Sequence, residues 1–216
     1  MPLPVYNRIA GQRLNRVEAL SDGVFAIAMT LLVLELRIPV NDAIRSEADV
    51  WRIFVHLKAE LLTYFLSFMT LGIFWVGQSV QFQYIVKSDR NLFWINILFL
   101  MLVSLLPFTT SFLARYIEYK AAIIVYWINI LLLGIFIYIN WIYVMKHNYA
   151  ATEAGSIEAI DKALRKRVIV AQSLYAVGML LCFISTYASI IFIILVQLNY
   201  AFAIVGSGRA KKTPGK

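Results

Sequence analysis

The stretch VIVAQSLYAVGMLLCFISTYASIIFIILVQLNYAFAIV, residues 168–205, runs for 38 residues without one charged side chain. A straight helix of that length would measure roughly 57 Å, whereas the hydrocarbon core of a bilayer is about 30 Å thick. Two membrane helices joined by a tight turn fit better than one. The turn is predicted at 185–189, where Ser-Thr-Tyr-Ala-Ser forms the one polar cluster of the stretch.

The rest of the chain has the same apolar character. Of 216 residues 61% are hydrophobic and 15% charged, against about 45–50% and about 25% in soluble domains. Four further apolar runs are each long enough to cross a bilayer: 17–36, 61–84, 91–113 and 121–145. The interval 40–58 is expected to hold a short helix at the membrane surface, and 147–167 a polar loop with an amphipathic turn or two. The sequence therefore predicts an all-α membrane protein of six transmembrane helices.

The distribution of basic residues orients these helices. With six spans, 14 of the 20 Lys and Arg residues fall on one side, which the positive-inside rule places in the cytoplasm. The predicted plan is a cytoplasmic segment 1–16, a transmembrane domain 17–207 and a basic cytoplasmic tail 208–216, in the plasma membrane. Five membrane spans would place the basic C-terminal tail on the extracellular side, against the positive-inside rule. The net charge of +8 reflects this topology rather than nucleic-acid binding.

Polar groups with possible function gather in the first predicted helix, RVEALSDGVFAIAMTLLVLEL (16–36). Ile27, Thr30 and Leu34 recur at helical spacing and form one stripe, although an aliphatic stripe with one Thr is also typical of simple packing. Asp22 lies about 140° around the helix from Ile27. If the stripe lines a pore, Asp22 points into the subunit and needs hydrogen-bond donors.

The predicted partners of that carboxylate come from the second and third helices and from its own helix: Trp75, Gln78, Asn91, Asn96, Ser21 and Arg16. The alternative is that Ser21 and Asp22 merely cap the helix, since both residue types are favoured N-caps. Asn129 and Asn140, on nearly one face of the fourth helix, are expected to join helices by hydrogen bonds.

The first helix resembles the signature of the transmembrane protein 175 potassium channels, R-x-x-x-F-S-D followed by V-F-A-I-x-x-T-L-L, over residues 16–32. Trp75, Phe82 and the stretch 96–109 resemble family positions more loosely. Two departures are Leu20, where the family has Phe, and Gln78, where it often has His. The second departure leaves the partner of Asp22 open.

The resemblance implies a homotetramer whose first helices surround a central pore. Its narrow points fall on Ile27, Thr30 and Leu34, with Leu31 beside them in the lining. Rings of Ile27 and Leu34 are expected to act as hydrophobic gates, and a Thr30 ring to contact K⁺ transiently. The implied function is a potassium-selective or weakly selective cation channel. It needs no cofactor and no fixed metal, and its partners are other copies, the bilayer and monovalent cations.

Three alternatives remain from the residues alone. A secondary transporter would show internal repeats and broken helices, and no obvious repeat is present. An intramembrane enzyme would need a nucleophile and base or a metal cluster at membrane depth. Asp22 is the one deep acid, and the two histidines, His56 and His147, are far apart, so an enzyme is not expected. A non-conducting membrane assembly protein is the third.

Overall fold

The structure is a computed structural model that describes residues 13–37, 46–151 and 157–202. It consists of helices, in the order α2 (Leu14–Val33), α3 (Glu47–His56), α4 (Lys58–Tyr84), α5 (Arg90–Arg115), α6 (Lys120–Lys146), α7 (Ile157–Leu180), the short 3-10 helix η1 (Leu181–Phe183) and α8 (Thr186–Phe202). The predicted tail 208–216 and most of the predicted segment 1–16 lie outside the described residues.

Four of the described helical segments are long and apolar enough to cross a membrane: Lys58–Tyr84, Arg90–Arg115, Lys120–Lys146 and Ile157–Phe183. Helix α8 is apolar but shorter. Helix α2 has twenty residues, and Arg16, Glu18 and Asp22 within them lower its apolar character. An all-helical membrane protein is thus confirmed, while the total of six spans stays a prediction.

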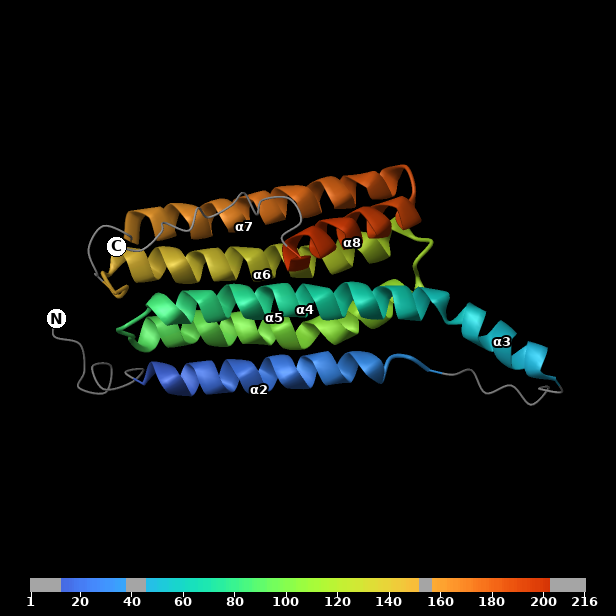
Figure 1. The fold of residues 1–216 in the computed structure, drawn as a ribbon, viewed down its shortest axis with the longest axis horizontal. Coiled ribbons are helices and arrows are strands. Elements are labelled where there is room, and N and C mark those ends of the chain that lie inside the picture. The colour runs from blue at the N-terminus through green and yellow to red at the C-terminus, as the bar shows by residue number, and fades with distance from the viewer. Residues whose placement is uncertain (1–12, 38–45, 152–156, 203–216) are drawn as a thin grey trace, which may run out of the picture.

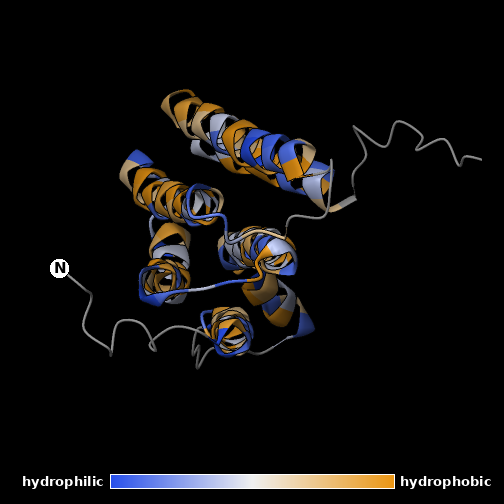
Figure 2. Cartoon of the chain, turned by 90° about the vertical axis from the view of Figure 1, so that its left-hand side faces the viewer, coloured by the Kyte–Doolittle hydropathy of each residue, from blue (hydrophilic) through white to orange (hydrophobic). Residues whose placement is uncertain are grey.

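The long helices lie side by side and alternate in direction (Figure 1). Helix α5 packs against α6, α4 and α2, while α7 and α8 pack against each other and against α6 and α4 respectively. Helix α2 therefore lies at one edge of the bundle, away from α7 and α8, as the view along the bundle also shows (Figure 2). Helix α3 is the short helix expected within 40–58, and it projects beyond the end of the bundle where α2 finishes (Figure 1).

A buried hydroxyl cluster joins four helices inside this bundle. The Tyr126 hydroxyl of α6 lies 3.1 Å from the hydroxyls of both Ser67 and Thr70 on α4. Thr110 of α5 donates to Ser67 at 2.7 Å, and Gln197 of α8 donates to Thr70 at 2.7 Å. Polar side chains in an apolar surrounding must find partners in the protein, so the cluster fixes which faces of these helices meet.

The predicted polar loop 147–167 is partly wrong, because α7 already begins at Ile157. The Arg165 Nε donates to the Asp161 carboxylate at 2.6 Å one helical turn away, and Trp141 of α6 donates to the same carboxylate at 2.8 Å. An i,i+4 ion pair stabilises a helix, and the Trp141 bond anchors it to α6. The Asp161–Arg165 pair therefore lets α7 begin at Ile157, before its apolar part.

The predicted turn at 185–189 is displaced. The chain reverses through η1 and Ser185, and α8 begins at Thr186. Ser185 accepts the backbone N–H of Ala188 at 3.4 Å, as residues at the start of a helix do. Ser189 lies inside α8, where its hydroxyl donates to the Gly178 carbonyl of α7 at 2.6 Å. Ser189, the last residue of the polar cluster, thus joins the two helices and takes no part in the turn.

Replacing Gly178 with alanine is expected to lower the free energy of unfolding by about 1–3 kcal/mol, the usual cost of overpacking a core. A Cβ there would lie 2.6 Å from Ile193 Cγ1, so α7 and α8 would have to separate. Gly72→Ala is the matched control, since a Cβ at Gly72 meets nothing within 4 Å. Thermal unfolding in detergent measures both, and equal melting temperatures for the two variants would contradict this close approach.

Candidate functional site

One face of α2 is built into the subunit. Its buried residues recur every three or four positions and form an inward stripe: Val17, Ser21, Phe25, Ala28 and Leu32. This stripe packs against α4 and α5. The Phe25 ring lies 6.0 Å from the Phe99 ring of α5, at a distance typical of aromatic pairs. The packing fixes the rotation of α2, and with it the residues that point outward.

The outward face of α2 carries the stripe predicted from the sequence. The exposed fractions are 60% for Ile27, 42% for Leu31 and 67% for Leu34, and Thr30 is exposed between them. These four residues are called the α2 outer face below. An apolar face of this extent on a membrane helix contacts either lipid or another subunit.

The Thr30 hydroxyl uses its hydrogen in a bond within α2. It donates to the Ile27 carbonyl of its own helix at 2.8 Å. A hydroxyl has one donor hydrogen and two acceptor lone pairs. With the hydrogen directed at the backbone, the lone pairs of this exposed oxygen are free to face whatever lies against the α2 outer face. The local geometry therefore presents an acceptor, the group that a cation requires.

Asp22 contacts one of its predicted partners. The indole N–H of Trp75 on α4 donates to the Asp22 carboxylate at 2.9 Å. In the single chain, however, Asp22 is exposed and Trp75 has 41% exposure, so the expectation that this carboxylate points into the body of the subunit is wrong. The pair lies on the flank of the α2 outer face, where α2 meets α4. It joins these two helices at the surface of the subunit.

Two other residues predicted for the same network lie in a separate one, buried between α4, α5 and α6. Gln78 donates to Asn96 at 3.1 Å, Asn96 donates to Asn140 at 2.9 Å and Asn140 donates to Gln81 at 2.8 Å. Gln81 in turn donates to the Ile137 carbonyl at 3.0 Å. The single network drawn from the sequence is therefore two, and Gln81 is a member that sequence reasoning missed.

The remaining predicted members contribute no bond to Asp22. The Ser21 hydroxyl is buried and has no hydrogen-bond partner among the described residues. Asn91 donates to Tyr143 at 3.3 Å, and Arg16 is exposed. Asn129 and Asn140 do join helices as expected, since Asn129 donates to Thr109 of α5 at 3.3 Å. Within the described residues no three His, Cys, Asp or Glu side chains come together as a metal site would require.

Comparison with known proteins places this arrangement in a family context. A family model described as "Endosomal/lysosomal potassium channel TMEM175" matches residues 16–107, which include α2, α3, α4 and most of α5. A protein of Chamaesiphon minutus named as a potassium channel is 33% identical over 188 residues, covering 82% of this chain and 87% of that protein. Another, from Streptomyces collinus, is 39% identical over 104 residues, so the match covers 48% of this chain and 49% of that channel.

A solved structure has the same fold. The crystal structure described as a lysosomal potassium-selective channel TMEM175 homolog from Chamaesiphon minutus superposes with a TM-score of 0.74 at 31% sequence identity. The superposition covers 88% of this chain and 97% of that one. The similarity therefore extends over the helices on both sides of α4 and α5, well beyond the segment that the family model matches.

Proposed function

The chain belongs to the TMEM175 family of potassium channels, and from this we propose that it is one subunit of a channel that conducts K⁺. The observation that carries the proposal is the α2 outer face, an exposed apolar strip with one oxygen acceptor in it. A family of ion channels also means that the chain is not an enzyme. Its permeant ion is K⁺, and conduction needs no cofactor.

In the proposed assembly, four copies place α2 around a common axis, and six helices of each copy cross the membrane. Ile27 and Leu34 form apolar rings on either side of a ring of Thr30 hydroxyls, with Leu31 completing the lining. Apolar constrictions gate a pore by excluding water, and rings of oxygen atoms replace part of the hydration shell of an ion. The outward orientation of all four side chains in the single chain supports this arrangement.

The orientation in the membrane follows from charge. Helix α2 begins, α4 ends, α5 begins and α6 ends at one end of the bundle, and the basic start of α7 lies there too (Figure 1). Basic residues at that end include Arg13, Arg16, Lys87, Arg90, Lys146, Lys162, Arg165, Lys166 and Arg167. By the positive-inside rule this end faces the cytoplasm. We place the protein in the plasma membrane with both termini cytoplasmic.

Purified protein in liposomes tests the function directly. Opposed K⁺, Na⁺ and Cs⁺ gradients are expected to produce passive cation flux that is faster for K⁺ than for Na⁺, and planar bilayers are expected to show unitary currents. Empty liposomes prepared in the same detergent are the control. Slow, saturable flux coupled to a second ion without unitary currents would indicate a secondary transporter, and a complete lack of flux would indicate an assembly protein.

Asp22→Ala is expected to lower the yield of assembled oligomer more than it alters the conductance of the channels that form. The Asp22 carboxylate holds α4 through Trp75, and it lies off the strip that ions would contact. Trp75→Phe keeps an aromatic ring but removes the indole N–H, so it should reproduce the assembly defect in weaker form. Size-exclusion chromatography and single-channel recording separate the two effects. Normal assembly with altered conductance would place Asp22 in the pore.

A further inference from the structure

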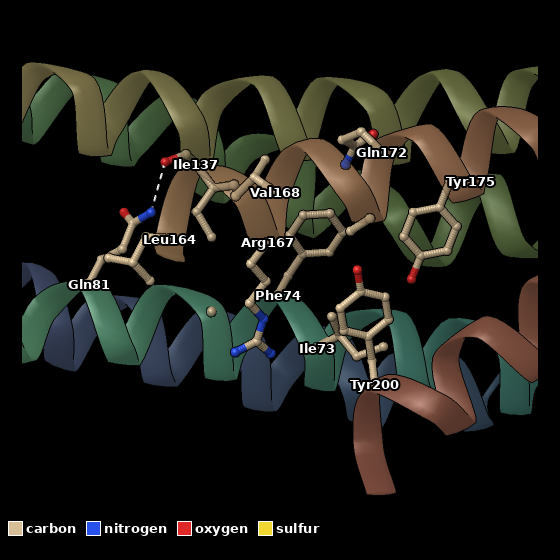
Figure 3. Close-up of a pocket in the computed structure, with 12 residues that line it drawn as sticks. Ile73, Phe74, Gln81, Ile137, Leu164, Arg167, Val168, Gln172, Tyr175 and Tyr200 are labelled. Carbon is tan, nitrogen blue, oxygen red and sulfur yellow. Dashed lines mark hydrogen bonds between the residues drawn. The ribbon is translucent and has the colours of Figure 1, made fainter. Parts of the chain in front are cut away.

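A cavity separates α7 from α4 on the side of the bundle that α2 does not reach. It is partly open to its surroundings and has a cavity volume of about 50 Å³, and its walls come from α4, α6, α7 and the last turns of α8. Ile73 and Phe74 of α4 and Val168 of α7 give it apolar walls (Figure 3). Ala171 of α7 also lines it. Its origin is the length of α8: seventeen residues span about 26 Å, so α8 fills the space between α4 and α7 over only part of their length.

One wall of this cavity carries an arginine without a counter-ion. Arg167 is partly buried and extends from α7 toward α4 across the cavity (Figure 3). It forms no ion pair with any acidic residue in the described part of the chain, whereas its neighbour Arg165 is paired with Asp161 at 2.6 Å. A charge beside an apolar wall at membrane depth is costly unless an opposite charge meets it.

One further polar group faces the same space. Tyr200 of α8 points its hydroxyl into the cavity (Figure 3), whereas the Gln172 amide is directed at α6, where it donates to the Ile130 carbonyl at 3.4 Å. The sequence 203–216 that follows α8 contains no Asp or Glu, so its side chains supply no anion for Arg167. Arg167 therefore has no acidic partner among the described residues, and an anion seated in the cavity would supply one.

We propose that this cavity binds an anionic phospholipid of the surrounding bilayer. Its phosphate would accept hydrogen bonds from the Arg167 guanidinium, which matches phosphate oxygens in a bidentate manner. One acyl chain would lie along Val168, Ala171 and Ile73, away from the basic end of α7. The Tyr200 hydroxyl would donate to the glycerol or headgroup oxygens.

The location favours a lipid over a soluble anion. Arg167 is the last charge before the uncharged run 168–205, so it marks the boundary between headgroups and hydrocarbon. Basic pockets between membrane helices are a general means of holding anionic headgroups. A free phosphate would pair with Arg167 and leave the apolar walls without a contact. A phospholipid pairs with Arg167 through its phosphate and contacts the apolar walls through an acyl chain. This inference does not depend on ion conduction.

Native mass spectrometry of the whole protein in detergent tests the site with phosphatidylglycerol and phosphatidylcholine as probes. Phosphatidylglycerol is expected to bind at least tenfold more tightly than phosphatidylcholine. Arg167→Gln should remove that preference, whereas Lys166→Gln, the same charge change at an exposed neighbour, should weaken binding less than twofold. Equal affinity for both lipids, or equal loss in both variants, would overturn the proposal.

A second pair of variants tests the apolar part. Ala171→Leu fills the cavity and is expected to weaken phosphatidylglycerol binding about fivefold or more, while Ala163→Leu, on an exposed part of α7, should leave it unchanged. Undiminished binding in Ala171→Leu, or displacement of the lipid by millimolar glycerol phosphate, would mean that only an anion is recognised and would overturn the lipid assignment. This pair also decides the outcome if Arg167→Gln does not fold.

Discussion

Replacing Thr30 with alanine is expected to lower the ratio of K⁺ to Na⁺ permeability by about tenfold. The Thr30 oxygen is exposed, and its hydrogen is held by the Ile27 carbonyl, so the proposed ring offers lone pairs to a passing cation. The contact between a hydroxyl lone pair and a cation is an ion–dipole interaction that replaces part of the hydration shell of the ion. If the Thr30 oxygens favour K⁺ over Na⁺ by about 1.4 kcal/mol, which corresponds to a factor of ten, their removal lowers the ratio of K⁺ to Na⁺ permeability by about that factor.

Reversal potentials in asymmetric K⁺ and Na⁺ solutions measure this ratio. Thr30→Ser is the matched control, because serine keeps the hydroxyl and its bond to the helix backbone, and it should retain most of the selectivity. Leu31→Ala controls for a change of volume on the same face without removal of an oxygen. An unchanged reversal potential in Thr30→Ala would show that Thr30 is not the selective element, even if the protein conducts.

The second large effect concerns stability. Asn140→Leu is expected to lower the free energy of unfolding by about 2–6 kcal/mol, because it leaves the Gln81 oxygen without its donor and removes one of the two acceptors of the Asn96 amide, which keeps only the Leu92 carbonyl. Each buried group left unsatisfied costs about 1–3 kcal/mol. Leucine keeps the branched shape of asparagine, but its methyl groups are larger than the amide atoms, so overpacking adds to the cost of breaking the hydrogen-bonded network between α4, α5 and α6.

A graded series makes this expectation specific. Gln78→Leu removes the end of the same network and leaves only the Asn96 oxygen unpaired, so it should cost about half as much. Ser104→Ala removes a hydroxyl that bonds only within its own helix and is exposed, and it should be nearly neutral. Melting temperatures in detergent rank the three variants. If Gln78→Leu lowers the melting temperature as much as Asn140→Leu, the central position of Asn140 in the hydrogen-bonded network gives it no larger effect, and this expectation is contradicted.

The differences between the predicted and the observed elements have a common cause. The sequence predicts a turn at 185–189 and a polar loop over 147–167, because polar residues beside an apolar run usually mark an exit from the membrane. Here Ser189 bonds to Gly178 across a helix pair, and Asp161 bonds to Trp141 of the neighbouring helix. Hydrogen bonds between helices leave no periodic pattern in the sequence, so the local sequence does not predict these two contacts.

The site shows the same limit. Helical spacing was sufficient to place Ile27, Thr30 and Leu34 on one strip, because the period of a helix is fixed by its backbone. The separation of Asp22 and Trp75 from Gln78 and Asn96 was not predictable. Trp75 and Gln78 are three residues apart on α4, and only the direction in which α2 and α5 approach that helix determines which partner each one meets.

By itself the sequence determined that this protein is an all-helical membrane protein and that Ile27, Thr30 and Leu34 lie on one face of the first helix. Both follow from local properties, namely the length of the hydrophobic runs and the period of the helix. Only the tertiary structure decided that this strip points out of the bundle, that Asp22 is held at its flank by Trp75, and that Arg167 faces a cavity without a counter-ion. Those outcomes depend on the lengths and packing of neighbouring helices, above all the short α8, and no single segment encodes them.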